Sequence, residues 1–86
     1  MTENELKILG FVKEDILDDS NGDYYYYLQI VDGLSLISNS RDEKKDEEWF
    51  VDVFNTEPTI RFQKMEQVQS LVNILTRSIV RNDAKQ

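Results

Sequence analysis

Four consecutive tyrosines, Tyr24 to Tyr27, run directly into an apolar segment from Leu28 to Val31. Aromatic and β-branched side chains suit a pleated, half-buried surface, so this run predicts a β-strand. The side chains of a strand alternate between the two faces of its sheet, which puts two tyrosines on each face. One pair can enter a core beneath the sheet. The other pair needs a cover that the rest of the chain or a partner has to supply.

Tyr25 and Tyr27 lie on the opposite face from Tyr26 under any register of the neighbouring strand. Three covers are open for their face. A short N-terminal helix could bring Leu6 and Leu9 over it, and a second copy of the chain or a different protein could also cover it. An exposed aromatic patch usually marks an interaction site. If a second copy or a different protein is the cover, the face of Tyr25 and Tyr27 is therefore a binding surface.

A hairpin turn is expected at residues 32–33, because Asp-Gly favours the two-residue turns that match the twist of strands. The return strand covers residues 34–39. With a two-residue turn, Leu34 and Leu36 lie on the face of the tyrosine pair that needs a cover, and Ile37 lies on the opposite face. A longer loop would change the register and move these residues across the sheet.

The C-terminal third of the chain has a helical period. Its apolar residues recur at spacings of three and four, which is typical of an amphipathic helix packed on a sheet. They are Met65, Val68, Leu71, Val72, Leu75 and Ile79. Near the N-terminus, Thr2 and Glu5 match a capping box, and Gly10 suits the end of a short helix.

These patterns predict a single α+β domain over residues 1–86. It is an antiparallel meander of three to five strands packed on one C-terminal amphipathic helix, with a short N-terminal helix. The expected segments are a helix over 2–10, sheet strands within 11–17 and 24–63, a helix over 65–81 and a tail over 82–86. An apolar content of 40% suffices for one small core in a chain of 86 residues.

The strand expected at residues 49–54 adds aromatic side chains next to an acidic segment. Residues 40–48 include no apolar side chain, so they predict either a solvated loop or an acidic contact loop. The predicted binding residues are the anchors Tyr25, Tyr27, Trp49 and Phe50, with a polar rim of Asp46, Glu47 and Glu48.

Charge is distributed unevenly along the chain. Residues 1–57 carry 15 acidic and 5 basic side chains, whereas residues 58–86 carry 2 acidic and 5 basic ones. Direct binding to a nucleic-acid backbone needs clustered Lys and Arg, so the net charge of −7 disfavours it. An acidic surface either keeps a small protein in solution or faces a partner protein that is basic or binds nucleic acid.

Catalytic, metal and cofactor sites find little support in the sequence. The chain has no histidine and no cysteine, which excludes imidazole and thiolate chemistry. Its three glycines are isolated and form no phosphate-binding loop. Asp52, between two phenylalanines of its strand face, is a candidate acid or simply an outward-facing carboxylate. The turn at 18–23 is a candidate for a weak divalent-ion site, although it fails the EF-hand spacing. We therefore expect a protein that is not an enzyme and has no metal or cofactor.

Two features of the sequence bear on location. No stretch approaches the roughly 18 apolar residues of a membrane span. The segment 1–5 lacks the positive start and apolar run of a secretion signal, and the lack of cysteine fits a reducing compartment. We expect a cytoplasmic protein without membrane association.

The order of these segments resembles that of small uncharacterised acidic proteins of bacterial phages and mobile elements. The resemblance covers about residues 9–78. It rests on the tyrosine strand 24–27, the segment 34–39, the acidic residues 46–48 before Trp49, and the leucine-rich closing helix. It has no defining catalytic motif, so it implies no functional residue. It does imply a context in which short acidic proteins block or adapt a host protein.

The sequence therefore predicts a non-enzymatic protein-interaction module, and the resemblance implies an inhibitor or accessory protein encoded by a phage or mobile element. It would dock on a host protein through an aromatic sheet face with an acidic rim. Two alternatives stay open. One is a homodimeric structural protein that uses the same face or a strand edge, and the other is a small-ligand binder with stacking tyrosines.

Overall fold

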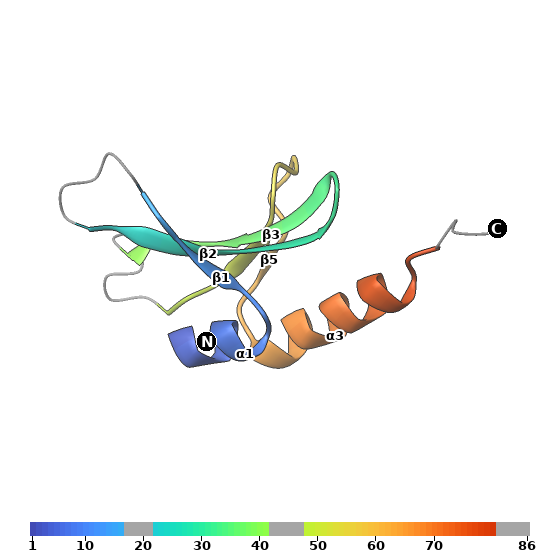
Figure 1. The fold of residues 1–86 in the computed structure, drawn as a ribbon, viewed down its shortest axis with the longest axis horizontal. Helices are drawn as coiled ribbons and strands as arrows, with labels where there is room; N and C mark the ends of the chain where they lie inside the picture. Colours follow the sequence, from blue (N-terminus) through green and yellow to red (C-terminus); the bar gives the residue numbers. More distant parts are fainter. Residues whose placement is uncertain (17–21, 42–47, 81–86) are drawn as a thin grey trace.

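A computed structural model of the chain describes residues 1–16, 22–41 and 48–80. It confirms the predicted α+β fold, with an antiparallel sheet of strand order β1-β2-β3-β4-β5 in the described ranges. The elements are α1 (Glu3–Ile8), β1 (Val12–Asp15), β2 (Tyr24–Val31), β3 (Leu34–Ser38), β4 (Val51–Val53), β5 (Arg61–Phe62) and α3 (Met65–Arg77) (Figure 1). The candidate ion-binding turn at 18–23 falls largely outside the described residues, as does the expected tail.

The short helix α1 is defined at both ends by backbone chemistry that the sequence predicts. The amide of Glu5 donates to Oγ1 of Thr2, and the amide of Thr2 donates to Oε1 of Glu5, which completes the capping box. At the other end, Gly10 takes a positive φ of 100°, and the Phe11 amide donates to the Leu6 carbonyl. This glycine-dependent ending turns the chain directly into β1.

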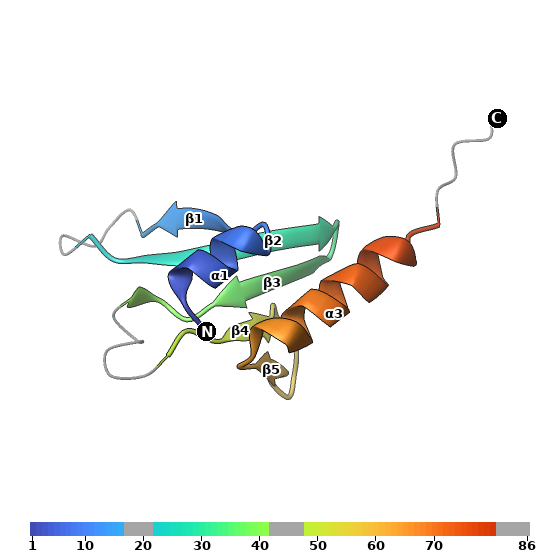
Figure 2. The same cartoon turned by 90° about the horizontal axis from the view of Figure 1, so that it is seen from below.

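Helix α3 ends at Arg77, earlier than the predicted boundary at residue 81. The hydroxyl of Thr76 donates to the Val72 carbonyl at 2.8 Å, and that of Ser78 donates to the Ile74 carbonyl at 2.6 Å. Side-chain hydroxyls that bind helix carbonyls favour termination over continuation. The C-terminal end of α3 extends past the turn between β2 and β3 (Figures 1 and 2).

Both helices lie on the same face of the sheet, as Figure 1 shows. We call this the inner face. Leu6 of α1 and Val68 of α3 are fully buried there. They belong to a core with Tyr26 of β2 and Leu36 of β3. The N-terminal helix is therefore not the cover expected for Tyr25 and Tyr27, because it shares the inner face with α3.

The register of the central hairpin differs from the one expected for a two-residue turn. The turn is present, and Val31 pairs with Leu34, but the next pairs are Gln29 with Ser35 and Leu28 with Leu36. One extra residue in β2 is thus accommodated by a β-bulge at Ile30. Because side chains alternate along a strand, this shift exchanges the two faces of β3 relative to the prediction.

The consequence is that β3 contributes Leu36 to the core, next to the buried polar side chain of Ser38 on the same face. Leu34 and Leu36 lie on the inner face, opposite to their predicted side, and Leu36 is completely buried. Ile37 pairs with Tyr27 and lies with it on the outer face. Strand β2 pairs with β1 in a regular register over Tyr24–Tyr27, without a bulge. Side chains therefore alternate there, which confirms that Tyr25 and Tyr27 face away from Tyr26.

Candidate functional site

The outer face of the sheet carries a continuous row of side chains across all five strands. Successive pairs place one residue from each strand directly beside the next. The row consists of Val12, Tyr27, Ile37, Asp52 and Arg61. Directly opposed side chains on one face lie within contact distance, so this row is a single surface feature.

A second row runs beside the first and adds two aromatic positions. Tyr25 pairs with Glu14 of β1, and Phe50 lies one alternation before Asp52 on the same face. Tyr25, Tyr27 and Phe50 are each half-buried. Their rings are therefore partly accessible although they pack on their neighbours. We call Tyr25, Tyr27, Ile37 and Phe50 the outer aromatic patch.

The ring of Tyr27 has a defined position on this face. Its hydroxyl lies 2.9 Å from Oγ of Ser35, on the neighbouring strand. Ser35 is only 8% exposed, so the ring shields a polar group that would otherwise face solvent. A ring whose polar end is fixed in this way offers its apolar edge in a preset orientation, which lowers the entropy lost on docking.

Arg61 of β5 lies at the edge of the patch that is farthest from β1, and it makes two kinds of contact. Nε of Arg61 donates to Oδ1 of Asp52 at 2.8 Å, and Nη2 donates to Oδ2 at 3.1 Å. The guanidinium carbon of Arg61 lies 3.8 Å from the centre of the Phe50 ring. Asp52, the carboxylate considered as a candidate acid, thus forms a bidentate ion pair with Arg61. This ion pair orients the guanidinium of Arg61 over the Phe50 ring.

Trp49 lies elsewhere than the predicted anchor position. It is 2% exposed and stacks on Tyr24 at 6.0 Å between ring centroids, with the ring of Tyr26 edge-on at 5.4 Å. The β4 strand that follows places Trp49 on the same side as Val51, which is fully buried. Trp49 therefore belongs to the core and contributes nothing to the outer face.

Of the predicted acidic rim, Asp46 and Glu47 lie outside the described residues. The side chain of Glu48 is 81% exposed, and its Oε1 lies 3.8 Å from the amino group of Met1. That amino group also donates to the Trp49 carbonyl at 3.2 Å. Glu48 is thus directed toward the N-terminal residue rather than toward the outer aromatic patch.

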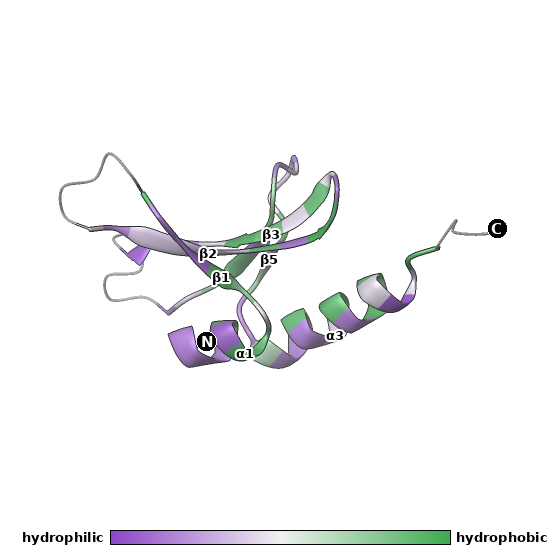
Figure 3. Cartoon of the chain, viewed as in Figure 1, coloured by the Kyte–Doolittle hydropathy of each residue, from purple (hydrophilic) through white to green (hydrophobic). Residues whose placement is uncertain are grey.

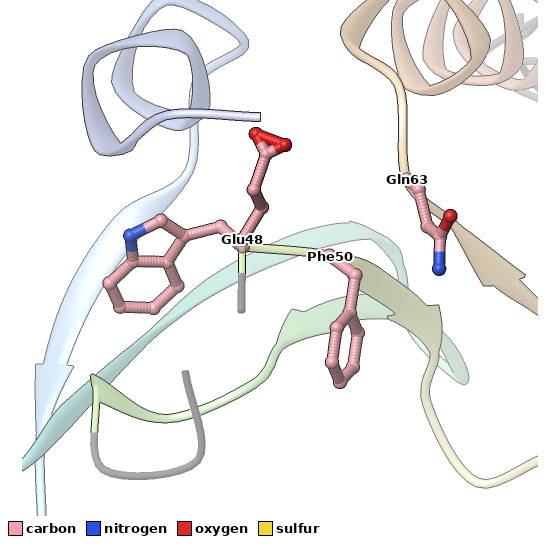
Figure 4. A pocket seen from close by; sticks show the side chains of 4 residues that line it. Glu48, Phe50 and Gln63 are labelled. Carbon is pink, nitrogen blue, oxygen red and sulfur yellow. The ribbon is translucent and has the colours of Figure 1, made fainter. Parts of the chain in front are cut away.

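A small cavity of about 230 Å³ lies next to these residues and is lined by Glu48, Trp49, Phe50 and Gln63 (Figure 4). Small-molecule sites usually occupy about 300–1,000 Å³. The tyrosines expected to stack on a ligand do not line this cavity. The small-ligand alternative therefore gains no support from its position or size.

A polar cluster on the inner face has no direct signal in the sequence. The hydroxyls of Tyr24 and Tyr26 both donate to Oε2 of Glu3, at 3.0 and 2.6 Å. These hydrogen bonds, foremost that from Tyr26, lower the pKa of the Glu3 carboxyl. Burial, and then the same carboxylate, raise the pKa of both tyrosines. Nζ of Lys13 lies 4.2 Å from the centre of the Tyr24 ring. The cluster attaches α1 to the sheet and is a structural site.

Neither a metal-binding cluster nor a membrane-spanning helix occurs in the described ranges. Residues 1–16, 22–41 and 48–80 bring together no group of three acidic side chains able to hold a metal ion. The helices in those ranges are too short or too polar to cross a membrane.

Comparison of the chain with protein-family models, with curated proteins and with solved structures gave no significant match. The resemblance to phage and mobile-element proteins accordingly stays a prediction from the sequence. The function has to be inferred from the surface itself.

Proposed function

We propose that this chain is a non-enzymatic protein-interaction module that docks on another protein through the outer aromatic patch. The observation that carries the proposal is the placement of both helices on the inner face (Figure 1). That placement leaves Tyr25, Tyr27, Ile37 and Phe50 without a helix of the described chain above them.

The composition of the patch supports a protein partner. Tyrosine and phenylalanine combine large apolar area with few rotatable bonds, and both are enriched at the cores of interfaces. Tyrosine is also common among the residues that dominate binding energy. The patch also has exposed apolar neighbours, since Val12 is 59% exposed and Phe54 is 55% exposed. Contiguous apolar surface of this kind on one sheet face is typical of an interaction site.

Charge favours a basic partner. The chain has a net charge of −7, and Glu14 lies beside Tyr25 on the outer face. An acidic protein attracts basic surfaces during encounter, which includes those of proteins that bind nucleic acid. Together with the resemblance to phage and mobile-element proteins, this charge favours a host-directed inhibitor or accessory role.

A capture experiment with a matched pair of variants tests the proposal. The wild-type chain, Tyr25→Ser/Tyr27→Ser and Ile74→Ser are each used as bait in nuclease-treated bacterial lysate, with mass spectrometry as the readout. Ile74 is 61% exposed on α3 and lies on an element of the inner side, so it provides the control. We expect the double variant to lose a protein that the wild type and the control both retain.

Circular dichroism and urea unfolding of the same proteins accompany the capture. If the folded double variant retains the captured protein, the outer face does not bind it. If the double variant unfolds, the two rings are needed for the fold and the docking proposal fails. Light scattering separates the homodimer alternative, because a dimer formed through this face would dissociate to half its mass in the double variant.

A further inference from the structure

The free edge of strand β1 is a second candidate interaction surface, next to the outer aromatic patch. Strand β1 is the first strand of the sheet, and in the described ranges no strand pairs with its other side (Figure 2). Its four residues are all exposed. An edge of this kind presents backbone N–H and C=O groups that another strand can bind.

Two hydrogen bonds show which groups point outward. The Ile16 amide donates to the Asp23 carbonyl of the β2 side, and the Tyr26 amide donates away from β1, to Oγ of Ser38. Residues of an antiparallel strand direct both backbone groups alternately to one side and the other. The N–H and C=O groups of Lys13 and Asp15 therefore point to the free edge.

The order of positive and negative side chains along β1 limits which strands can pair with its free edge. Lys13 and Asp15 lie on the inner side of β1, whereas Val12, Glu14 and Ile16 lie on the outer side. Charged side chains on an edge oppose pairing with an apolar or uniformly charged strand. They permit pairing with a strand whose charges run in the complementary order, and a second β1 is such a strand.

We propose that two copies of the chain pair antiparallel through β1, with Lys13 of each copy opposite Asp15 of the other. In this register Lys13 and Asp15 form the hydrogen-bonded pairs, as their outward groups require, and two ion pairs form on the inner side. Val12 then opposes Ile16 of the second copy on the outer side. The sheets of the two copies join into one, with their outer faces on the same side.

The neighbouring registers are less favourable. A shift by one residue would oppose outward groups with inward ones and lose the hydrogen bonds. A shift by two residues would place Lys13 against Lys13, or Asp15 against Asp15, of the second copy. In the proposed register the single like-charge contact is that between the two Glu14 side chains at the symmetry axis. This contact keeps the pairing weak and reversible.

Charge reversal tests the pairing independently of the outer aromatic patch. Sedimentation equilibrium at about 10 µM to 1 mM suits an interface smaller than the standard size. Lys13→Asp and Asp15→Lys each create two like-charge contacts and should raise the dissociation constant about tenfold or more. The double variant Lys13→Asp/Asp15→Lys should restore dimerisation, and Glu14→Gln should strengthen it. A monomeric wild type, or a double variant as weak as the single ones, would overturn the proposal.

Disulfide trapping tests the register, because the chain has no cysteine of its own. In the variant Glu14→Cys, the two introduced thiols at the axis would belong to residues with Cα atoms about 4.5 Å apart, close enough for a disulfide. This variant should therefore cross-link on oxidation. Val12→Cys in a Glu14→Gln background is the control, because its two copies would be about 13 Å apart. Cross-linking of the control but not of Glu14→Cys would reject the register. Tyr25→Ser/Tyr27→Ser should leave dimerisation unchanged, which separates this proposal from docking through the outer face.

Discussion

The hydroxyl of Tyr26 donates a 2.6 Å hydrogen bond to Oε2 of Glu3, across a sequence separation of 23 residues. The phenol ring is 1% exposed, and the carboxylate belongs to the first turn of α1. One oxygen atom therefore links the N-terminal helix to the centre of the sheet. The same oxygen accepts a hydrogen bond from Tyr24, so the link is shared by two inner-face tyrosines.

Tyr26→Phe should lower the free energy of unfolding by about 1–2 kcal/mol, because a hydrogen bond to a charged acceptor is lost while the ring stays in place. Tyr24→Phe is the matched control and should have a smaller effect, since Tyr24 as a whole is less buried than Tyr26 and its hydrogen bond is longer at 3.0 Å. Urea unfolding of the three proteins measures both changes. Equal effects of the two substitutions would contradict the central role of Tyr26.

Acid should weaken the fold partly through Glu3. Its pKa in the folded protein lies below that in the unfolded chain, chiefly because Tyr26 donates a hydrogen bond to it. The stabilisation is therefore complete above about pH 4.5 and is lost as the pH falls through the folded pKa. Glu3→Gln should unfold with a shallower dependence on pH in this range than the wild type. Parallel curves for the two proteins would exclude Glu3 as a source of the acid sensitivity.

High pH should also destabilise the fold, through deprotonation of Tyr26 in the same cluster. Burial raises the pKa of Tyr26 above its ordinary value of 10, and the hydrogen bond to Glu3 adds to this effect. The contribution of Tyr26 to stability is present below about pH 10 and is lost as the pH rises through its folded pKa. Absorbance titration should show a late phenol ionisation that disappears in Tyr26→Phe. A wild-type titration without such a component would contradict the burial of this hydroxyl.

The contact between Arg61 and Asp52 should be measurable but modest. The arginine side chain is 46% exposed, and exposed ion pairs usually contribute about 0.2–1 kcal/mol. A double-mutant cycle with Arg61→Ala and Asp52→Ala should give a coupling free energy within that range. Replacing Arg61 by Lys should recover only part of it, because an ammonium group cannot form the two parallel hydrogen bonds. A coupling near zero would mean that Asp52 does not orient Arg61 over Phe50.

Helix α3 should be anchored mainly by its first half. Val68 is completely buried, whereas Ile74 is 61% exposed. Hydrophobic and hydrophilic residues are interspersed along α3 (Figure 3). Val68→Ala should lower the free energy of unfolding by about 2 kcal/mol, through lost apolar burial and an unfilled space. Ile74→Ala should change it by no more than about 0.5 kcal/mol, because the side chain is on the surface. Hydrogen exchange should be fastest toward the C-terminal end of the helix.

The features that the sequence predicted well are local. The capping box of α1, the tyrosine strand and the Asp32–Gly33 turn each depend on residues within a few positions of one another. The α+β class followed from the change between a strand period and a helical period. Each of these signals lies within a single segment, so it survives without knowledge of the packing.

The features that the sequence did not predict depend on distant contacts. The bulge at Ile30 decides the face of Leu36 and Ile37, and nothing in the hairpin sequence marks it. The position of α1 follows from the contact of Glu3 with Tyr24 and Tyr26, whereas its apolar residues suit either face of the sheet. Alternation placed Trp49 with Val51, but it could not tell which of the two faces becomes the core.

The placement of both helices on one side of the sheet affects which positions of the chain can be substituted during evolution. The core residues Leu6, Leu36 and Val68 all lie on the inner side, so the free energy of folding is concentrated there. Substitutions at Tyr25 or Phe50 alter a surface that the helices do not touch. The side chains of the outer face can therefore change by mutation while the inner face preserves the fold.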